Sequence, residues 1–212
     1  MERVLIIGSK GMAGHIIRQY FLEQNKFIIK DIARDSTIFK PNYAIDLSEL
    51  NTLEEIINEF SPNYILNCIG ILNKDAEEHP DKAIFFNGYF PHFIAQKSGA
   101  KLIHISTDCV FSGKKGDYTV ADEKDGKGFY ASSKAVGEVV YGDHLTIRTS
   151  IVGPEIKANG IGLFNWFLKN KTPFVKGYNS VYWSGITTLQ LAKSIHQILV
   201  YQPSLYGLIH LT

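Results

Sequence analysis

Short apolar runs alternate along the chain with longer stretches of mixed polar and apolar residues. The short runs are typical of strands buried in a parallel sheet, and the longer stretches are typical of the helices that connect such strands. The pattern predicts strands at 3–7, 27–33, 43–45, 64–68, 101–106 and 145–148, and helices at 12–24, 49–59, 80–97 and 130–141. Strands that alternate with helices indicate an α/β fold with a doubly wound parallel sheet.

Chemically distinctive residues follow several of these predicted strands. Gly8 follows the first strand, Arg34 the second and Asp46 the third, while 67–70 and 106–109 end the next two. Ligands of doubly wound sheets bind beyond the carboxyl ends of the strands. We therefore expect the functional site at this edge.

Composition narrows the class of protein. The 212 residues are 45% hydrophobic, which suffices for one sizeable core, and the net charge of +1 gives no electrostatic footprint for nucleic acid. Cys68 and Cys109 are the only cysteines and lack metal-ligand spacing. Without a signal peptide or an apolar run of membrane length, we expect a cytoplasmic protein that binds neither nucleic acid nor membrane. The seven histidines are scattered, so no catalytic metal is expected, and His104 is interpreted as a core residue of an apolar strand.

The first strand runs directly into a turn with Gly8, Gly11 and Gly14. Glycines in this place permit a sharp turn and a close approach of pyrophosphate, and the N-terminus of the following helix favours phosphate. The spacing differs from the commoner dinucleotide fingerprint, so a plain glycine turn is the alternative. The position after the first strand favours nucleotide binding, and a P-loop is disfavoured because no Gly-Lys-Ser/Thr closes the motif.

Tyr130 and Lys134 stand four residues apart in a predicted helix, which places them on one face. A neighbouring cation favours a phenolate, so we expect Lys134 to lower the pKa of Tyr130 and to make it an acid or base for a substrate oxygen. By itself the spacing is more often a solvated surface pair. The preceding stretch 112–128, rich in glycine, lysine and aspartate, is expected to be a long surface loop able to fold over a substrate.

Several separated motifs occur in a recognisable order: Gly8-x-x-Gly11-x-x-Gly14, Asp46-Leu47, Asn67-Cys68-Ile69-Gly70, Asn87, Ser106-Thr107-Asp108-Cys109-Val110-Phe111-Ser112-Gly113, and Tyr130-x-x-x-Lys134 followed by Gly137-Glu138. Together they resemble the extended short-chain dehydrogenases/reductases, most closely the dTDP-4-dehydrorhamnose reductase branch. The resemblance implies a Rossmann fold and NAD(P)H-dependent reduction of the C4 keto group of a nucleotide-linked 6-deoxy-4-ketohexose. The product would serve polysaccharide or cell-envelope sugar synthesis.

The resemblance also assigns roles. Tyr130 would protonate the keto oxygen as hydride arrives, Lys134 would lower the pKa of Tyr130 and hold the nicotinamide ribose, and Thr107 would hydrogen-bond the same oxygen. The cofactor-binding candidates are Gly8, Lys10, Gly11, Met12, Gly14, Arg34, Asp46, Leu47, Cys68, Ile69, Gly70, Asn87, Ser106, Tyr130, Lys134, Ser150 and Ile151. The substrate-binding candidates are Asp108, Cys109, Asn159 and Trp166. The alternatives are a strand cap for Ser106, a turn residue for Asp108 and a helix cap for Asp46.

The end of the second strand bears on the choice of cofactor. Ala33 stands where an acidic residue often binds the adenosine 2′-hydroxyl, and Arg34 follows it. A guanidinium suits a 2′-phosphate, and Lys10 would add a second charge, so NADPH is favoured over NADH. If the strand ends earlier, Asp31 becomes the ribose ligand and NADH is favoured.

Departures from the branch bear on the reaction and the substrate. Dehydratases of the wider family carry Asp-Glu after the threonine, whereas this chain has Asp108-Cys109, so simple reduction fits better than elimination of water. Cys109 and Ile151 also replace a tyrosine and a tryptophan of the rhamnose-pathway enzymes, which leaves the hexose and its nucleotide, dTDP or UDP, open.

The expected organisation is a dinucleotide-binding domain at 1–152, onto which 178–212 packs back, with a partial substrate-binding region at 153–177. Relatives of the branch continue with further substrate-domain helices. An aromatic cluster indicates core packing or the helix-pair interface of a homodimer, and consists of Phe85, Phe86, Tyr89, Phe90 and Phe93. Two other functions stay open, namely an epimerase or dehydratase that recycles bound NAD, and a regulatory dinucleotide-binding protein without turnover.

Overall fold

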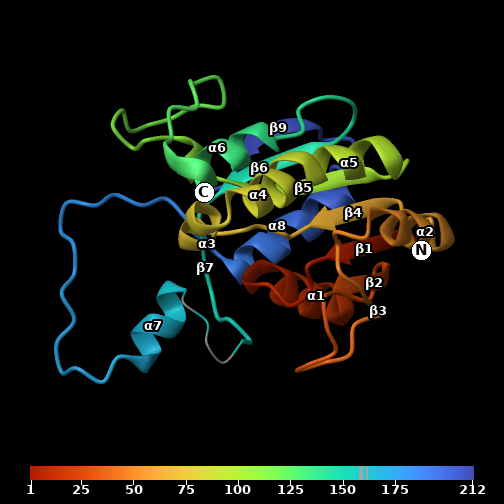
Figure 1. The fold of residues 1–212 in the computed structure, drawn as a ribbon, viewed down its shortest axis with the longest axis horizontal. Helices are drawn as coiled ribbons and strands as arrows, with labels where there is room; N and C mark the ends of the chain where they lie inside the picture. Colours follow the sequence, from red (N-terminus) through yellow and green to blue (C-terminus); the bar gives the residue numbers. More distant parts are fainter. Residues whose placement is uncertain (158–159, 161) are drawn as a thin grey trace.

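The computed structural model describes residues 1–157, 160 and 162–212, and its central element is a seven-stranded sheet (Figure 1). The strands are β1 (Arg3–Ile7), β2 (Ile28–Ala33), β3 (Tyr43–Ala44), β4 (Tyr64–Asn67), β5 (Lys101–Thr107), β6 (Leu145–Thr149) and β9 (Gly207–His210). They pair in parallel in the order β3-β2-β1-β4-β5-β6-β9. The predicted α/β fold with a doubly wound, Rossmann-like sheet is confirmed. Its strand order reverses between β1 and β4, which is where ligands of such sheets bind.

Helices cover both faces of the sheet (Figure 1). Those that contribute most to the two cores are α1 (Met12–Gln24), α2 (Leu50–Phe60), α5 (Phe90–Lys97) and α8 (Thr188–Tyr201). In β1, Val4 and Ile6 pack with α1 and α8, whereas Leu5 and Ile7 pack with α2 and α5. Successive strand residues point to opposite faces, so a strand covered on both sides must be apolar throughout.

The helices around the predicted 80–97 segment differ from the prediction. That segment is helical throughout but is divided into α4 (Pro80–Ala83), a π-helical segment (Ile84–Tyr89) and α5, and α3 (Asn73–Glu78) precedes it. Of the aromatic cluster, Phe90 and Phe93 are buried in the core with α2, while Tyr89 is 51% exposed.

Helix α6 (Gly128–Val136) ends at Val136 rather than at 141. A Cβ on Gly137 would lie 1.7 Å from Asn87 O, so at this glycine the chain passes directly against the π-helical segment. Glu138 then turns into the sheet, where it bonds to residues of β5 and β6.

The C-terminal part of the chain divides between packed and exposed elements. Strand β9 pairs with β6, α8 packs beside α1, and a second sheet that the sequence did not predict joins β7 (Ile151–Val152) to β8 (Ile186–Thr187). In contrast, α7 (Leu163–Lys169) and the segment 170–185 extend away from the sheet (Figure 1), and no residue of α7 is buried. Within the described ranges, none of the helices has the length and apolar character needed to cross a membrane.

Candidate active site

The glycine turn lies at the carboxyl end of β1. Gly8 has a left-handed φ of +85°, and a Cβ on Gly14 would lie 2.1 Å from Gly8 O, so α1 can begin this close to the turn only with glycines at these positions. Helix α1 begins at Met12, and its N-cap residue Gly11 supplies no side-chain cap. The first amides of a helix have no intrahelical partners, and here they face the turn. The arrangement fits the pyrophosphate of a dinucleotide.

Lys10, within this turn, is engaged by the segment that follows β2. Its Nζ donates to Asp35 O (2.6 Å), Asp35 Oδ1 (2.7 Å) and Thr37 O, and the side chain is only 8% exposed. An ammonium has three N–H donors, so all of them are used. The expectation that Lys10 offers a free charge to a 2′-phosphate is therefore wrong for this structure.

Strand β2 continues through Ala33, so Arg34 is the first residue beyond it, as predicted. Asp31 lies inside the strand and is fully buried. Its Oδ2 accepts from Ser9 Oγ (2.6 Å) and lies 3.3 Å from Arg18 Nε. The alternative in which the strand ends early and Asp31 binds the ribose is therefore wrong.

Asp46 forms the turn before α2. Its Oδ1 accepts from Ser48 N (2.9 Å) and Ser48 Oγ (2.8 Å), and these bonds, with the charge of Arg34, lower the pKa of Asp46. The alternative interpretation as a helix cap does not hold in this structure, because the N-cap residue of α2 is Glu49 and Asp46 bonds Ser48 in the turn before the helix. Leu47 beside it is buried against the core.

The chain after β4 closes the other side of the glycine turn. A Cβ on Gly8 would lie 2.7 Å from Ile69 Cδ1 and 3.3 Å from Cys68 C, so these residues and the turn are in direct contact. Asn87, a cofactor candidate, is fully buried and fixes the backbone just beyond Gly70. It accepts from Ile71 N (2.8 Å) and donates to Ile71 O (2.9 Å) and Ser133 Oγ (3.0 Å). Asn87 thereby ties this loop to α6.

Thr107 and Tyr130 form the candidate catalytic pair. Thr107 ends β5 and Tyr130 lies in the first turn of α6, where the Thr107 hydroxyl is close enough to influence the pKa of the phenol. Burial raises the pKa of Tyr130 to about 12; the neighbouring hydroxyl of Thr107 acts against this, and Cys109 and Asp108 add to it. Tyr130 therefore keeps its proton at neutral pH and is placed to donate it.

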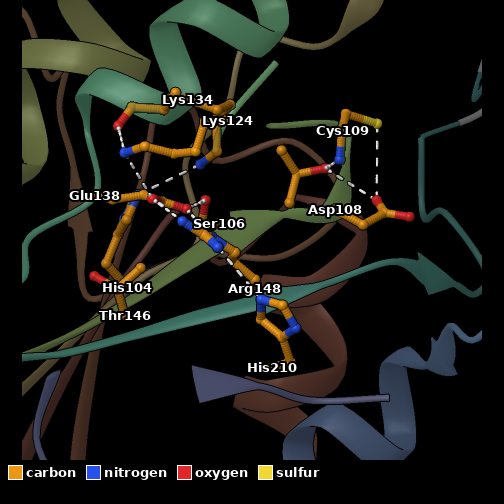
Figure 2. A network of polar contacts seen from close by, with 12 residues as sticks. His104, Ser106, Asp108, Cys109, Lys124, Lys134, Glu138, Thr146, Arg148 and His210 are labelled. Atoms are coloured by element: carbon orange, nitrogen blue, oxygen red, sulfur yellow. Dashed lines mark hydrogen bonds and ion pairs between the residues drawn. The ribbon is translucent and has the colours of Figure 1, made fainter. Parts of the chain in front are cut away.

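Lys134 is directed to β5 in this structure (Figure 2). Its Nζ donates to Ile105 O (2.7 Å) and lies 3.5 Å from His104 Nε2. Burial lowers the pKa of Lys134 to about 8, although Glu138 and Cys68 act in the opposite direction. The expectation that Lys134 lowers the pKa of Tyr130 is wrong for this structure, because burial dominates at the phenol.

His104 is a fully buried strand residue, as predicted, and it also contacts the candidate lysine. Asn67 Oδ1 accepts from Ile69 N (3.1 Å), so the amide nitrogen of Asn67 faces His104 Nδ1 (3.2 Å). Burial keeps the pKa of His104 well below its ordinary value, so the imidazole is neutral. The bond from Asn67 makes Nδ1 the acceptor and assigns the proton to Nε2, which faces Lys134.

Figure 2 shows a buried ionic network around Glu138 that the sequence did not predict. Glu138 accepts from Arg148 Nε (2.7 Å) and Nη2 (2.8 Å), from Ser106 Oγ (2.9 Å) and from Lys124 Nζ (3.1 Å). Ser106 is therefore bonded to this network rather than directed at a cofactor. Arg148 was the available signal, because an arginine inside an apolar strand requires a buried carboxylate.

Asp108 and Cys109 follow Thr107 in a short 3₁₀ turn, where Asp108 Oδ1 accepts from Thr107 Oγ1 (3.3 Å). Cys109 lines a hollow of about 490 Å³ whose other walls come from the long loop, namely Phe111, Ser112, Lys114, Asp125, Gly126 and Lys127. The loop is anchored there, because Asp125 accepts from Ser112 N (2.8 Å) and Lys124 bonds Glu138.

The remaining candidates lie toward the exposed elements. Ser150 accepts from Trp183 Nε1 (2.8 Å), Ile151 begins β7, and Trp166 is 49% exposed on α7. Asn159 lies outside the described residues. Among the residues that the structure describes, no group of three or more His, Cys, Asp or Glu side chains is arranged to hold a metal.

Known proteins resemble this chain in sequence. A sequence profile described as the RmlD substrate binding domain matches residues 1–172. The chain is 27% identical over 157 residues to a probable low-salt glycan biosynthesis reductase of Haloferax volcanii, covering 69% of this chain and 52% of that protein. It is 30% identical over 142 residues to methionine adenosyltransferase 2 subunit beta of Bos taurus, covering 65% of this chain and 42% of that protein. It thus spans about half the length of these curated relatives.

Among solved structures, a hypothetical dTDP-4-dehydrorhamnose reductase from Sulfolobus tokodaii superimposes with a TM-score of 0.80 at 28% identity. The match covers 98% of this chain and 75% of that one.

Proposed function

Since the chain belongs to the RmlD substrate binding domain family, we propose that it reduces the C4 keto group of a nucleotide-linked 6-deoxy-4-ketohexose with NADH or NADPH. The observation that carries the proposal is the pairing of Thr107, buried at the end of β5, with the partly buried Tyr130 in the first turn of α6. It lies at the same edge of the sheet as a glycine turn that fits a pyrophosphate. Reductase names among the relatives support the same reaction class.

When bound at the glycine turn, NADH or NADPH would supply a hydride for C4. Tyr130 donates its phenolic proton to the C4 oxygen, so that hydride and proton together convert the ketone to an alcohol. Thr107 Oγ1 holds the same oxygen and fixes its orientation. The raised pKa of Tyr130 suits this direction, because the phenol is protonated before the reaction begins.

Lys134 would stabilise the phenolate that Tyr130 becomes, once its ammonium leaves Ile105 O. Asn67, His104 and the Glu138 network hold the surrounding strands in place. Simple reduction is favoured over elimination of water because the position after Asp108 carries Cys109, whose pKa burial raises, and not a second carboxylic acid.

We also assign dinucleotide binding to 1–152 together with 178–212, and sugar-nucleotide contacts to 153–177. The first assignment is supported by β9 and α8, which complete the sheet and one of its faces. The second is supported by exposed aromatic side chains such as Trp166, which have surface available for a ligand.

A second candidate is a dinucleotide-binding subunit without turnover. It is favoured by the contact of Lys134 with Ile105 and His104, and by similarity to a protein named as a subunit of methionine adenosyltransferase. The two functions predict the same dinucleotide binding and opposite results in a turnover assay.

The test is oxidation of NADH and NADPH by the purified chain, measured against a panel of dTDP- and UDP-linked 4-keto-6-deoxyhexoses. We expect turnover with at least one sugar, and Tyr130→Phe should lower kcat about 100-fold or more with unchanged dinucleotide affinity. Tyr201→Phe, at a 79% exposed position on α8, is the matched control and should behave as wild type. Dinucleotide binding without turnover on any sugar would replace the reductase by the second candidate.

A further inference from the structure

Three cations surround the place where β1 and β2 end, and each lies close to a carboxylate. Lys10 bonds Asp35 (2.7 Å), and Arg18 lies 3.3 Å from Asp31. Arg34 is close enough to Asp46 to contribute to its lowered pKa, after the hydrogen bonds from Ser48. Each of these positive charges therefore has a negatively charged neighbour in the same chain.

The glycine turn and the segment after β2 are direct neighbours. Gly8 N (3.0 Å) and Ser9 N (3.1 Å) both donate to Ile32 O, which fixes the two loops against each other. In dinucleotide-binding sheets the adenosine ribose lies here, beyond the glycine turn and beside the end of the second strand. A residue that joins these loops is therefore in a position to select between a dinucleotide with a 2′-hydroxyl and one with a 2′-phosphate.

Lys10 is the cation that joins them. The segment 35–37 provides its three acceptors, two from Asp35 and one from Thr37, and the ring of Phe39 lies 5.2 Å from its Nζ. The bond from Lys10, followed by those from Thr37, holds the pKa of Asp35 far below its usual range, so the carboxylate is charged at any physiological pH. A 2′-phosphate carries about two negative charges and would have to take Lys10 from Asp35 while lying beside that carboxylate.

We propose that Asp35 sets the choice of cofactor: by holding Lys10 it disfavours a 2′-phosphate, so that the chain binds NADH in preference to NADPH. The inference rests on the proposed function only for the presence of a dinucleotide site. It reverses the preference expected from Arg34 and Lys10 as separate residues, because it treats Lys10 and Asp35 as a neutral pair.

The test is the dissociation constant of NADH and of NADPH, measured by nicotinamide fluorescence or calorimetry without any sugar. Asp35→Asn should shift the ratio of the two constants about tenfold toward NADPH by strengthening NADPH binding. Adding Lys10→Met to Asp35→Asn should abolish that gain. Asp143→Asn removes the same charge at an 80% exposed position before β6 and should leave the ratio unchanged.

Lys10→Met alone keeps the test decisive if Asp35→Asn fails to fold. It should change both constants by the same factor, because Lys10 is not available to the phosphate in the wild type. The proposal is overturned if Lys10→Met selectively weakens NADPH about tenfold, or if wild type prefers NADPH. It is also overturned if Asp35→Asn weakens NADH without a gain for NADPH, since Asp35 would then contact the nucleotide itself. If neither dinucleotide binds wild type, the proposed function fails and this inference fails with it. If both bind without sugar turnover, only the reductase fails.

Discussion

Replacing Arg148 by methionine tests how the base of the candidate site is held together. Arg148 and Glu138 are almost completely buried, with side chains 3% and 1% exposed. Of the four hydrogen bonds that Glu138 accepts, two come from Arg148. Arg148→Met leaves an apolar side chain in the strand but leaves the carboxylate with only Ser106 and Lys124 as donors.

The expected cost follows from the burial of the remaining charge. Removing one partner of a buried ion pair lowers the free energy of unfolding by about 3–5 kcal/mol. Because the bond from Lys124 is retained, we expect a loss of about 3 kcal/mol for Arg148→Met. Lys124 is 37% exposed, so Lys124→Met should cost only about 1 kcal/mol or less. The double variant Glu138→Leu/Arg148→Met removes both buried charges and should be more stable than Arg148→Met alone.

The assay is urea unfolding followed by circular dichroism for wild type and the three variants. A domain of this size is stabilised by about 5–15 kcal/mol, so a loss of about 3 kcal/mol is readily measured. The reasoning is refuted if Arg148→Met costs no more than Lys124→Met. It is also refuted if the double variant is less stable than Arg148→Met, because the unpaired carboxylate would then not be the source of the loss.

Two further predictions use the same unfolding assay. Gly137→Ala should lower the free energy of unfolding by about 3 kcal/mol, because its Cβ would lie 1.7 Å from Asn87 O. Gly88→Ala, whose Cβ would have its nearest neighbours at 3.7 Å, should lower it by no more than about 1 kcal/mol. Equal losses would show that the backbone at Gly137 can move away from Asn87 without a loss of stability. Burial lowers the pKa of Lys134 from 10.5 to about 8, so between these values the unfolded chain binds more protons and stability rises with pH. Lys134→Met should therefore be more stable than wild type at pH 7 by about 3 kcal/mol, and the difference should shrink toward pH 10; a constant difference would contradict the lowered pKa.

The parallel sheet and the glycine turn were predictable because their determinants are local. Residues Val4 to Ile7 are apolar without interruption because both faces of β1 are covered, and the sequence shows this directly. Gly8 and Gly14 are required by one close approach within a single turn. The fold and this part of the site follow from neighbours in the sequence.

Partners from distant segments were not predictable from spacing. The sequence places Lys10 beside a phosphate site, but its ammonium is satisfied by Asp35 and Thr37, across a separate loop. Likewise, Tyr130 and Lys134 share a helix face, but Lys134 bonds Ile105 O of β5. Helical spacing determines the face from which a side chain extends. The partner of its terminal group depends on tertiary contacts, which the spacing does not show.

The two halves of the candidate site also differ in how they are supported. Thr107 ends a strand of a sheet covered on both faces, Tyr130 lies in α6, and Ser106, beside Thr107, is bonded to the Glu138 network. Trp166 has no comparable frame, because no residue of α7 is buried and the helix extends away from the sheet. Under the proposed function, dinucleotide binding would depend on the first half and sugar-nucleotide contacts on the second, so the two would be separable properties of this chain. Dinucleotide binding without sugar binding would then locate the deficiency in 153–177 and not in the glycine turn.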